Sequence, residues 1–478
     1  MIPYALLQMD IDMEKEYEHL EIRVLDLMAG EVTFRLPKSI DIEKNKIDKI
    51  SFNFFDFEKY GYNKIYPKEY ELWENSITED DEEKDWVKEY CKTYSFRCEE
   101  EDFIRETKNL IKQYTDYIYL KLSGDGVLSG KLVGYPYSLD ASFCSSLKNF
   151  QKKLFTYSLA KCGKSPNFFD FDVDYGILLD NPCLYGMFLK YDWRDFLAEY
   201  FEKLNLTGHP IAKVYMEKSN WLYIGNSFCG RLLPEYEILN RILDKAHREK
   251  INIAIVFSKM TESEISYYEE YFNNLKNDEN IKQIKEFVVN DWGMLLLINE
   301  KFIDAPVDKT DSYDKAWNIK ITLGVLLNKH WKDVRMEYKK GRDDTLLSEN
   351  SFNDELIKEY MEEKYNISGY MYETSGQKYD INSNSDIIFP FFQMNTGAKC
   401  TLNSVVKYGD RGRQICDDDC KMVCLEKCFV YPTHLNMAGV YNSLFGYDKE
   451  VLCDEHILGS FVKQGAKRLI FNGFVLDG

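Results

Sequence analysis

The sequence is short of proline, of histidine and of basic charge, and it has no long apolar run. Only 11 of its 478 residues are proline and 45% are hydrophobic, which is the composition of a folded chain rather than a disordered one. No window approaches the run of about 18 apolar residues that a membrane-spanning helix needs. The first residues carry no basic segment ahead of an apolar stretch, which argues against a secretory signal peptide. We therefore expect a cytoplasmic protein without a membrane span.

The shortage of basic residues bears on the kind of partner that the chain can bind. It has 61 Lys and Arg against 80 Asp and Glu, a net charge of -19. A surface this acidic repels phosphate backbones, so a dedicated nucleic-acid binder is not expected. The six histidines are dispersed, and the sequence has neither an HExxH motif nor the pattern of a Ser-His-Asp or Cys-His protease. These absences count against a peptidase.

The length of the chain predicts two or three domains. In residues 1–205 short strands and helices alternate, which predicts an α+β domain. Residues 22–37 have β-rich halves around Gly30 and predict a hairpin, and residues 101–122 have the apolar spacing of a helix.

From about Pro210 the pattern changes to repeated strand-then-helix units. Residues 210–216 are expected as a strand, and Thr261 with Glu264 forms a capping box at the start of a later helix. Repeated units of this kind predict parallel strands joined by right-handed crossovers. We therefore expect residues 206–478 to form an α/β, TIM-barrel-like domain, complete or incomplete.

Cysteine is the residue that the sequence concentrates. Five of its twelve cysteines fall between Cys400 and Cys428, the last four of them at every fourth position. In a reducing compartment such clustering is typical of metal ligands or catalytic thiols rather than of a disulfide framework. Burial of small apolar side chains does not by itself explain so dense a group.

The spacing of these cysteines is that of a ligand set. Cys400 is followed after fifteen residues by Cys416 and then by Cys420, and a four-residue step in a helical turn places two thiols on one face. Cys229 and Cys400 each follow a predicted strand, so both should lie at the mouth of the barrel. Four cysteines suit either a tetrahedral zinc ion or a [4Fe–4S] cluster.

The C-terminal part of the chain resembles the collagenase-like peptidases of family U32, above all the UbiV-type iron–sulfur proteins of oxygen-independent hydroxylation. The resemblance covers roughly residues 205–478. Its passages are YIGNSFCGR (Tyr223–Arg231), VVNDWGMLLL (Val288–Leu297), the cysteine motif of Asn395–Cys420, and CFVYPTHLNMAGVYN (Cys428–Asn442).

The resemblance implies a [4Fe–4S] cluster on Cys229, Cys400, Cys416 and Cys420, with zinc as the alternative cofactor. Cys424 and Cys428 repeat the same step and are alternate ligands. The implied function is an oxygen-independent hydroxylase, a related modifying enzyme or a subunit of one, acting with a related partner protein on a small-molecule or macromolecular substrate. The alternative is a non-catalytic scaffold or binding protein stabilised by its metal, and a peptidase is the weakest of the three.

Overall fold

The computed structural model describes residues 6–13, 20–22, 24–37, 42, 47–56, 61–75, 91–122, 141–161, 169–303, 319–332, 334, 348–397, 399–408, 420–430 and 436–476. Two separate hydrophobic cores lie within these residues, one N-terminal and one C-terminal. None of the helices in this part of the chain is both long and apolar enough to cross a membrane.

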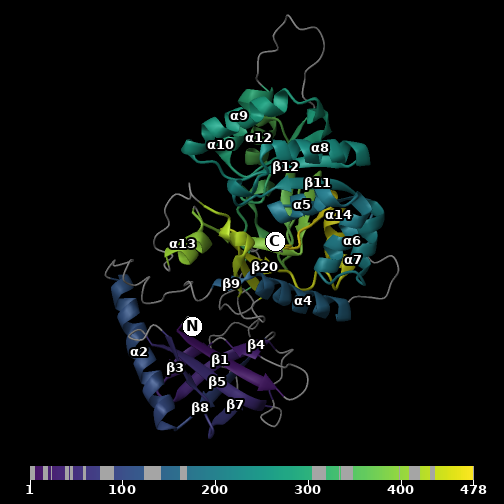
Figure 1. The fold of residues 1–478 in the computed structure, drawn as a ribbon. Coiled ribbons are helices and arrows are strands. Elements are labelled where there is room, and N and C mark those ends of the chain that lie inside the picture. Colours follow the sequence, from purple (N-terminus) through teal and green to yellow (C-terminus); the bar gives the residue numbers. More distant parts are fainter. Residues whose placement is uncertain are drawn as a thin grey trace, which may run out of the picture.

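The N-terminal core lies among two four-stranded antiparallel sheets and one helix (Figure 1). Phe52 of one sheet, Phe96 of the other and Phe103 of the helix meet with ring centroids 4.9 to 5.5 Å apart. The predicted hairpin is confirmed, with Gly30 at φ 77° in its turn. The elements are β1 (Leu7–Met13), β2 (Leu20–Ile22), β5 (Ile47–Asp56) and β6 (Gly61–Ile65) in the first sheet, β3 (Val24–Met28), β4 (Glu31–Pro37), β7 (Glu71–Glu74) and β8 (Cys91–Arg97) in the second, and α2 (Glu101–Leu122).

The C-terminal core is built around a closed barrel of eight parallel strands, so the predicted TIM-barrel-like fold is confirmed. The last strand pairs with both the first and the seventh, which closes the ring. In barrel order the strands are β10 (Asp174–Leu179), β11 (Ser219–Gly225), β12 (Asn252–Phe257), β13 (Ile284–Val289), β14 (Lys320–Leu323), β15 (Ile367–Glu373), β16 (Ser385–Phe389) and β21 (Ala466–Phe471).

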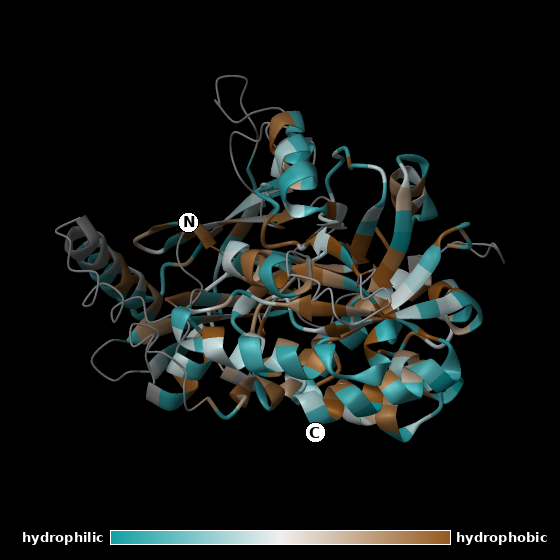
Figure 2. Cartoon of the chain, turned by 90° about the horizontal axis from the view of Figure 1, so that it is seen from above, coloured by the Kyte–Doolittle hydropathy of each residue, from teal (hydrophilic) through white to brown (hydrophobic). Residues whose placement is uncertain are grey.

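Helices follow most of the barrel strands and bury one apolar face each. In α8, for example, Leu239, Ile242 and Leu243 are buried while the opposite face is polar. Figure 2 shows the same division, with hydrophobic residues on the strands and hydrophilic ones on the outer helix faces. The helices are α5 (Pro182–Lys190), α6 (Trp193–Lys203), α7 (Pro210–Lys218), α8 (Tyr236–Glu249), α9 (Ile265–Lys276), α10 (Trp292–Ile298), α12 (Glu355–Tyr365) and α14 (Glu455–Lys463).

Two sequence expectations need correction. The predicted boundary between 205 and 206 falls inside the barrel, because its first strand, β10, already lies at residues 174–179. Residues 210–216 form helix α7 rather than a strand. Pro210 occupies the first helical position and the His209 ring accepts a hydrogen bond from the Ile211 backbone N–H, so the local signals start a helix.

A second, smaller sheet is inserted between β16 and β21. Its strands are β17 (Phe391–Thr396), β18 (Lys427–Val430), β19 (Met437–Val440) and β20 (Ser443–Tyr447), with α13 (Thr401–Tyr408) and a 3₁₀ turn, η9 (Val423–Leu425), between the first two. Strand β9 (Ala141–Phe143), far away in the sequence and directly before α4 (Cys144–Lys161), completes its edge (Figure 1). Because the insertion starts where β16 ends, it lies at the carboxyl mouth of the barrel.

The opposite half of the barrel interior contains a buried ionic group. Arg468 pairs with Glu286 and with Asp386, whose Oδ1 lies 2.8 Å from Nε, and the Tyr223 hydroxyl donates to Asp386 Oδ2 at 2.7 Å. Two carboxylates thus share one guanidinium away from water. Burial raises the pKa of Asp386 to about 7, with Arg468 opposing the shift and Glu286 adding to it.

This group predicts a specific pH dependence of stability. Because the pKa of Asp386 is higher in the folded than in the unfolded chain, the folded state keeps a proton that the unfolded state loses. Stability should therefore fall as pH rises from about 4 to about 7, and Asp386→Asn should remove on the order of 4 kcal/mol of that fall. Urea unfolding across this pH range measures the effect. Asp174→Asn, at an exposed carboxylate near the same end of the barrel, is the control and should keep the wild-type slope.

Candidate functional site

The carboxyl end of the barrel collects polar side chains from several strands. Asp180 and Asn181 follow β10, Asn226 follows β11 and Asn290 follows β13, and all four are buried. In barrels of this type the residues that follow the strands form the functional face. The Cys229 loop and the inserted sheet start from the same end.

Cys229 is positioned by the turn that ends β11. Gly225 has φ 113°, and a Cβ there would lie 2.3 Å from the carbonyl oxygen of Val256, so the turn requires glycine. Asn226 then organises the loop, because its Oδ1 accepts hydrogen bonds from the backbone N–H groups of Phe228, at 2.8 Å, and Cys229, at 3.0 Å. These contacts fix the backbone that carries the Cys229 thiol.

Cys400 lies directly before helix α13. Its Sγ contacts the carbonyl oxygen of Tyr441 at 3.6 Å and accepts a hydrogen bond from the Asn403 backbone N–H at 3.4 Å. These two contacts fix the position of the Cys400 thiol at the start of the helix.

The loops that carry these two cysteines are joined by Asn442. Its Nδ2 donates to the carbonyl oxygen of Phe228, next to Cys229, at 2.8 Å, and to that of Gly397, three residues before Cys400, at 3.4 Å. Asn442 is itself buried. The sequence prediction that Cys229 and Cys400 lie at one barrel mouth agrees with this bridge.

Cys424 lies in η9, which packs against α13, and it is the most buried of the thiols in this part of the site. Burial raises its pKa, and the negative charges of Cys229, Cys400 and Cys420 raise it further. Charges act on a group in this way only over short distances. Cys229, Cys400 and Cys420 therefore each lie within electrostatic range of Cys424.

The remaining cysteines of the motif differ from the expectation. Cys416 lies outside the described residues. The four-residue step does not follow one helical face, because Cys424 is in a 3₁₀ turn and Cys428 is already in strand β18. Cys428 contacts Cys144 instead, and the hydrogen bond between the two thiols lowers its pKa. The alternate ligand Cys428 is thus in a different place from the alternate ligand Cys424.

An acidic group that the sequence reading missed lies beside the cysteines. Asp180 accepts hydrogen bonds from the Tyr441 hydroxyl, at 2.9 Å, and from the Asn181 amide, at 2.8 Å, and burial raises its pKa to about 6. Tyr441 contacts Cys400 through its backbone. The signal was the run DYGILL followed by a polar Asp-Asn pair, which marks a buried strand and its carboxyl end.

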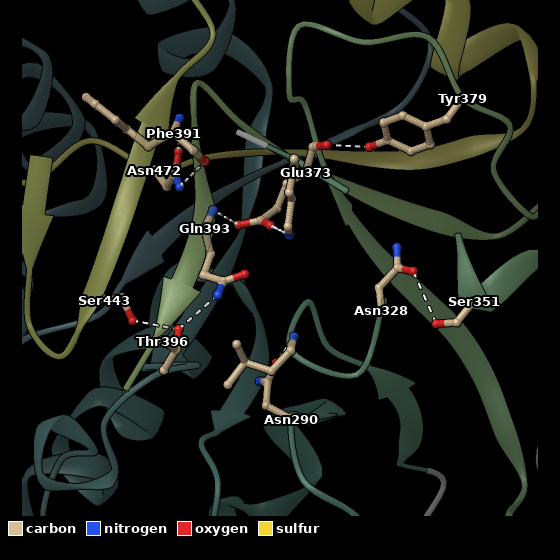
Figure 3. A network of polar contacts seen from close by, with 12 residues as sticks. Asn290, Asn328, Ser351, Glu373, Tyr379, Phe391, Gln393, Thr396, Ser443 and Asn472 are labelled. Atoms are coloured by element: carbon tan, nitrogen blue, oxygen red, sulfur yellow. Dashed lines mark hydrogen bonds and ion pairs between the residues drawn. The ribbon is translucent and has the colours of Figure 1, made fainter. Parts of the chain in front are cut away.

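A second polar network extends around the mouth from these groups (Figure 3). Glu373, at the end of β15, forms an ion pair with Lys332, and its Oε1 accepts a hydrogen bond from the Gln393 backbone at 2.8 Å. The Gln393 side chain donates in turn to the Thr396 hydroxyl at 3.1 Å. The inserted strand β17 is therefore tied to the barrel by polar contacts.

Among the described residues, no three His, Cys, Asp or Glu side chains lie close enough together to hold a single metal ion. Comparison with protein-family models, with curated proteins and with solved structures finds no match to the chain. The chemistry of the site is therefore argued from its own residues.

The Asn442 bridge makes a prediction about the two cysteine loops. Asn442→Ala removes both hydrogen bonds, so the loops should separate more readily and the chain should lose about 1 to 3 kcal/mol of stability. In metal-free protein, alkylation of Cys229 and Cys400 by iodoacetamide should become faster relative to the buried Cys98. Mass spectrometry of modified peptides measures the rates.

Asn220→Ala is the matched control, because Asn220 makes an exposed hydrogen bond to Asp174 at the other end of the barrel. It should leave both thiols at the wild-type rate. Unchanged alkylation in Asn442→Ala would mean that Asn442 does not hold the two loops together.

Proposed function

We propose that the C-terminal barrel is an iron–sulfur protein with a [4Fe–4S] cluster at its mouth, held by Cys229, Cys400, Cys420 and Cys424. The observation that carries the proposal is that thiols from three separate segments lie within electrostatic range of Cys424. Asn226 and Asn442 fix the loops of the first two, and η9 packs Cys424 against the helix that follows Cys400. Ligands supplied by distant loops are typical of a cofactor seated on a large scaffold.

The way in which the ligands are supplied favours a cluster over zinc. Structural zinc sites usually take their ligands from two short hooks in the sequence. Here Cys420 and Cys424 form one short hook, whereas Cys229 and Cys400 come from distant loops.

The resemblance of residues 205–478 to UbiV-type proteins supports a role in oxygen-independent hydroxylation or a related modification. The cluster, when bound, would supply one-electron transfer. The chain's own residues orient it: the Asn226 side chain fixes the Cys229 backbone, and Asp180 holds the hydroxyl of Tyr441, whose carbonyl contacts Cys400. The proposed role is that of an enzyme or of one subunit of an enzyme.

Metal analysis of anaerobically purified protein tests the proposal. We expect about four iron atoms per chain and a visible thiolate-to-iron absorption band. Ser substitution at Cys229, Cys400, Cys420 or Cys424 should each lower the iron content by more than half. Cys428→Ser is the matched control, since Cys428 contacts Cys144 instead, and it should retain iron and colour.

The variant Cys416→Ser decides whether Cys416 or Cys424 is the fourth ligand. If Cys424 is the ligand, Cys416→Ser keeps its iron. Loss of iron in Cys416→Ser with retention in Cys424→Ser would return the ligand set to Cys229, Cys400, Cys416 and Cys420. Zinc in place of iron in the wild-type protein would overturn the proposal and leave a metal-stabilised scaffold as the better account.

A further inference from the structure

The connection between barrel strands β15 and β16 contains no helix. Residues 374–384 run from the end of one strand to the start of the next in turns and extended chain. In a regular barrel a helix covers the outer face at this position. A pocket of about 1000 Å³ lies along the connection instead, between the start of α12 and helix α14. This β15–β16 pocket is large enough for a small molecule.

Two buried hydroxyl groups in the wall of this pocket have no hydrogen-bond partner. Thr374 and Ser375 directly follow β15 and line the pocket, with 1% and 7% of their surfaces exposed. Thr374 Oγ1 and Ser375 Oγ have no donor or acceptor within reach among the described residues. A buried polar group without a partner destabilises a fold, and native structures keep few of them. A ligand in the pocket would supply the missing partners.

The charge of the pocket is strongly negative. Its described lining residues include one lysine, Lys378, and six carboxylates, none of which forms an ion pair with a Lys, Arg or His of the described residues. A concave surface lined by one sign of charge attracts ligands of the opposite sign. The six carboxylates are those of Glu349, Asp354, Asp380, Asp448, Glu450 and Asp454.

Three of these carboxylates are positioned by backbone N–H groups, which hold them without an ion pair. Asp354 and Asp454 cap helices α12 and α14. Asp448 Oδ2 accepts a hydrogen bond from the Gly376 backbone N–H at 3.1 Å, which fixes the chain next to Ser375. Burial raises the pKa of Asp448 to about 6, so its carboxyl group is still mostly ionised at pH 7.

The arrangement of the lining favours an extended cation over a single ion. Among the described residues no three His, Cys, Asp or Glu side chains are close enough to hold one metal ion, so the negative charges are spread over the pocket. The rings of Tyr379 and Phe461, both buried, also line it with centroids 5.4 Å apart. Aromatic rings pack well against methylene groups. A methylene chain with ammonium groups at intervals matches both features.

We propose that the β15–β16 pocket binds an aliphatic diamine or polyamine. Its ammonium groups pair with Asp380 and Glu450 and donate hydrogen bonds to the hydroxyls of Thr374 and Ser375, while its methylene groups lie against the aromatic rings. The site is separate from the proposed cluster, because none of the described lining residues is a cysteine. It does not depend on the iron–sulfur proposal.

Isothermal titration calorimetry of the full chain with spermidine, at constant ionic strength, tests the proposal. Spermidine should bind, and an equal concentration of Mg²⁺ should not displace it. Asp380→Asn and Glu450→Gln should each weaken binding about threefold, because exposed ion pairs contribute little singly. Glu359→Gln is the matched control: it removes the same charge from an exposed position of α12 outside the described lining and should bind as the wild type does.

Thr374→Val distinguishes a ligand site from a feature of the fold. Because the hydroxyl has no partner, its removal should raise the thermal unfolding midpoint of the ligand-free chain. The same variant should bind spermidine about fivefold more weakly, since it loses a hydrogen bond to the ligand. A lowered midpoint would mean that the hydroxyl serves the fold.

Four other results would overturn the polyamine site. They are no binding of spermidine, its displacement by an equal concentration of Mg²⁺, wild-type affinity in both Thr374→Val and Asp380→Asn, and binding of a trilysine peptide without binding of spermidine. The same measurements on colourless Cys400→Ser protein should give the wild-type affinity, so loss of the cluster and loss of the polyamine site are told apart.

Discussion

Closure of the barrel is the constraint on which the rest of the structure depends. Once β21 pairs with both β10 and β16, all eight strands are parallel in one ring and their carboxyl ends share one mouth. Side chains as distant in the sequence as those of Asp180 and Tyr441 then form a hydrogen bond. The mouth is therefore formed by residues from several strand ends, and no short segment of the chain could form it alone.

The insertion between β16 and β21 turns this mouth into a thiol site. It starts at the end of a barrel strand, so it must leave the barrel at that face, and its antiparallel sheet returns the chain to α14 and β21. Strand β9 pairs with β18 at its edge, which brings the N-terminal half of the chain into the same sheet. Cys144 and Cys428 lie at this junction, whereas Cys424 faces the barrel loops. Cys424 and Cys428, although only four residues apart, therefore contact different parts of the structure.

The sequence predicted the parts of the fold that have strong local signals. The hairpin around Gly30 and the capping box of Thr261 and Glu264 were both predicted correctly, because turns and caps are set by adjacent residues. Helix α7 was misread as a strand, since a short apolar segment fits either period and its Pro210 and His209 signals were overlooked. Strand β10 was missed, and with it the true start of the barrel and the buried Asp180.

The candidate site was predictable only in part for a related reason. Cys229 could be placed because it follows barrel strand β11. Cys400 was expected to follow a barrel strand as well, but the strand before it is β17 of the inserted sheet. Which other cysteines of the repeat are ligands depended on whether the four-residue step lies on one helix. It does not, because a 3₁₀ turn followed by strand β18 occupies this part of the repeat. Asn442, which joins the two cysteine loops, carries no sequence motif, because its partners Phe228 and Gly397 meet it only through the fold.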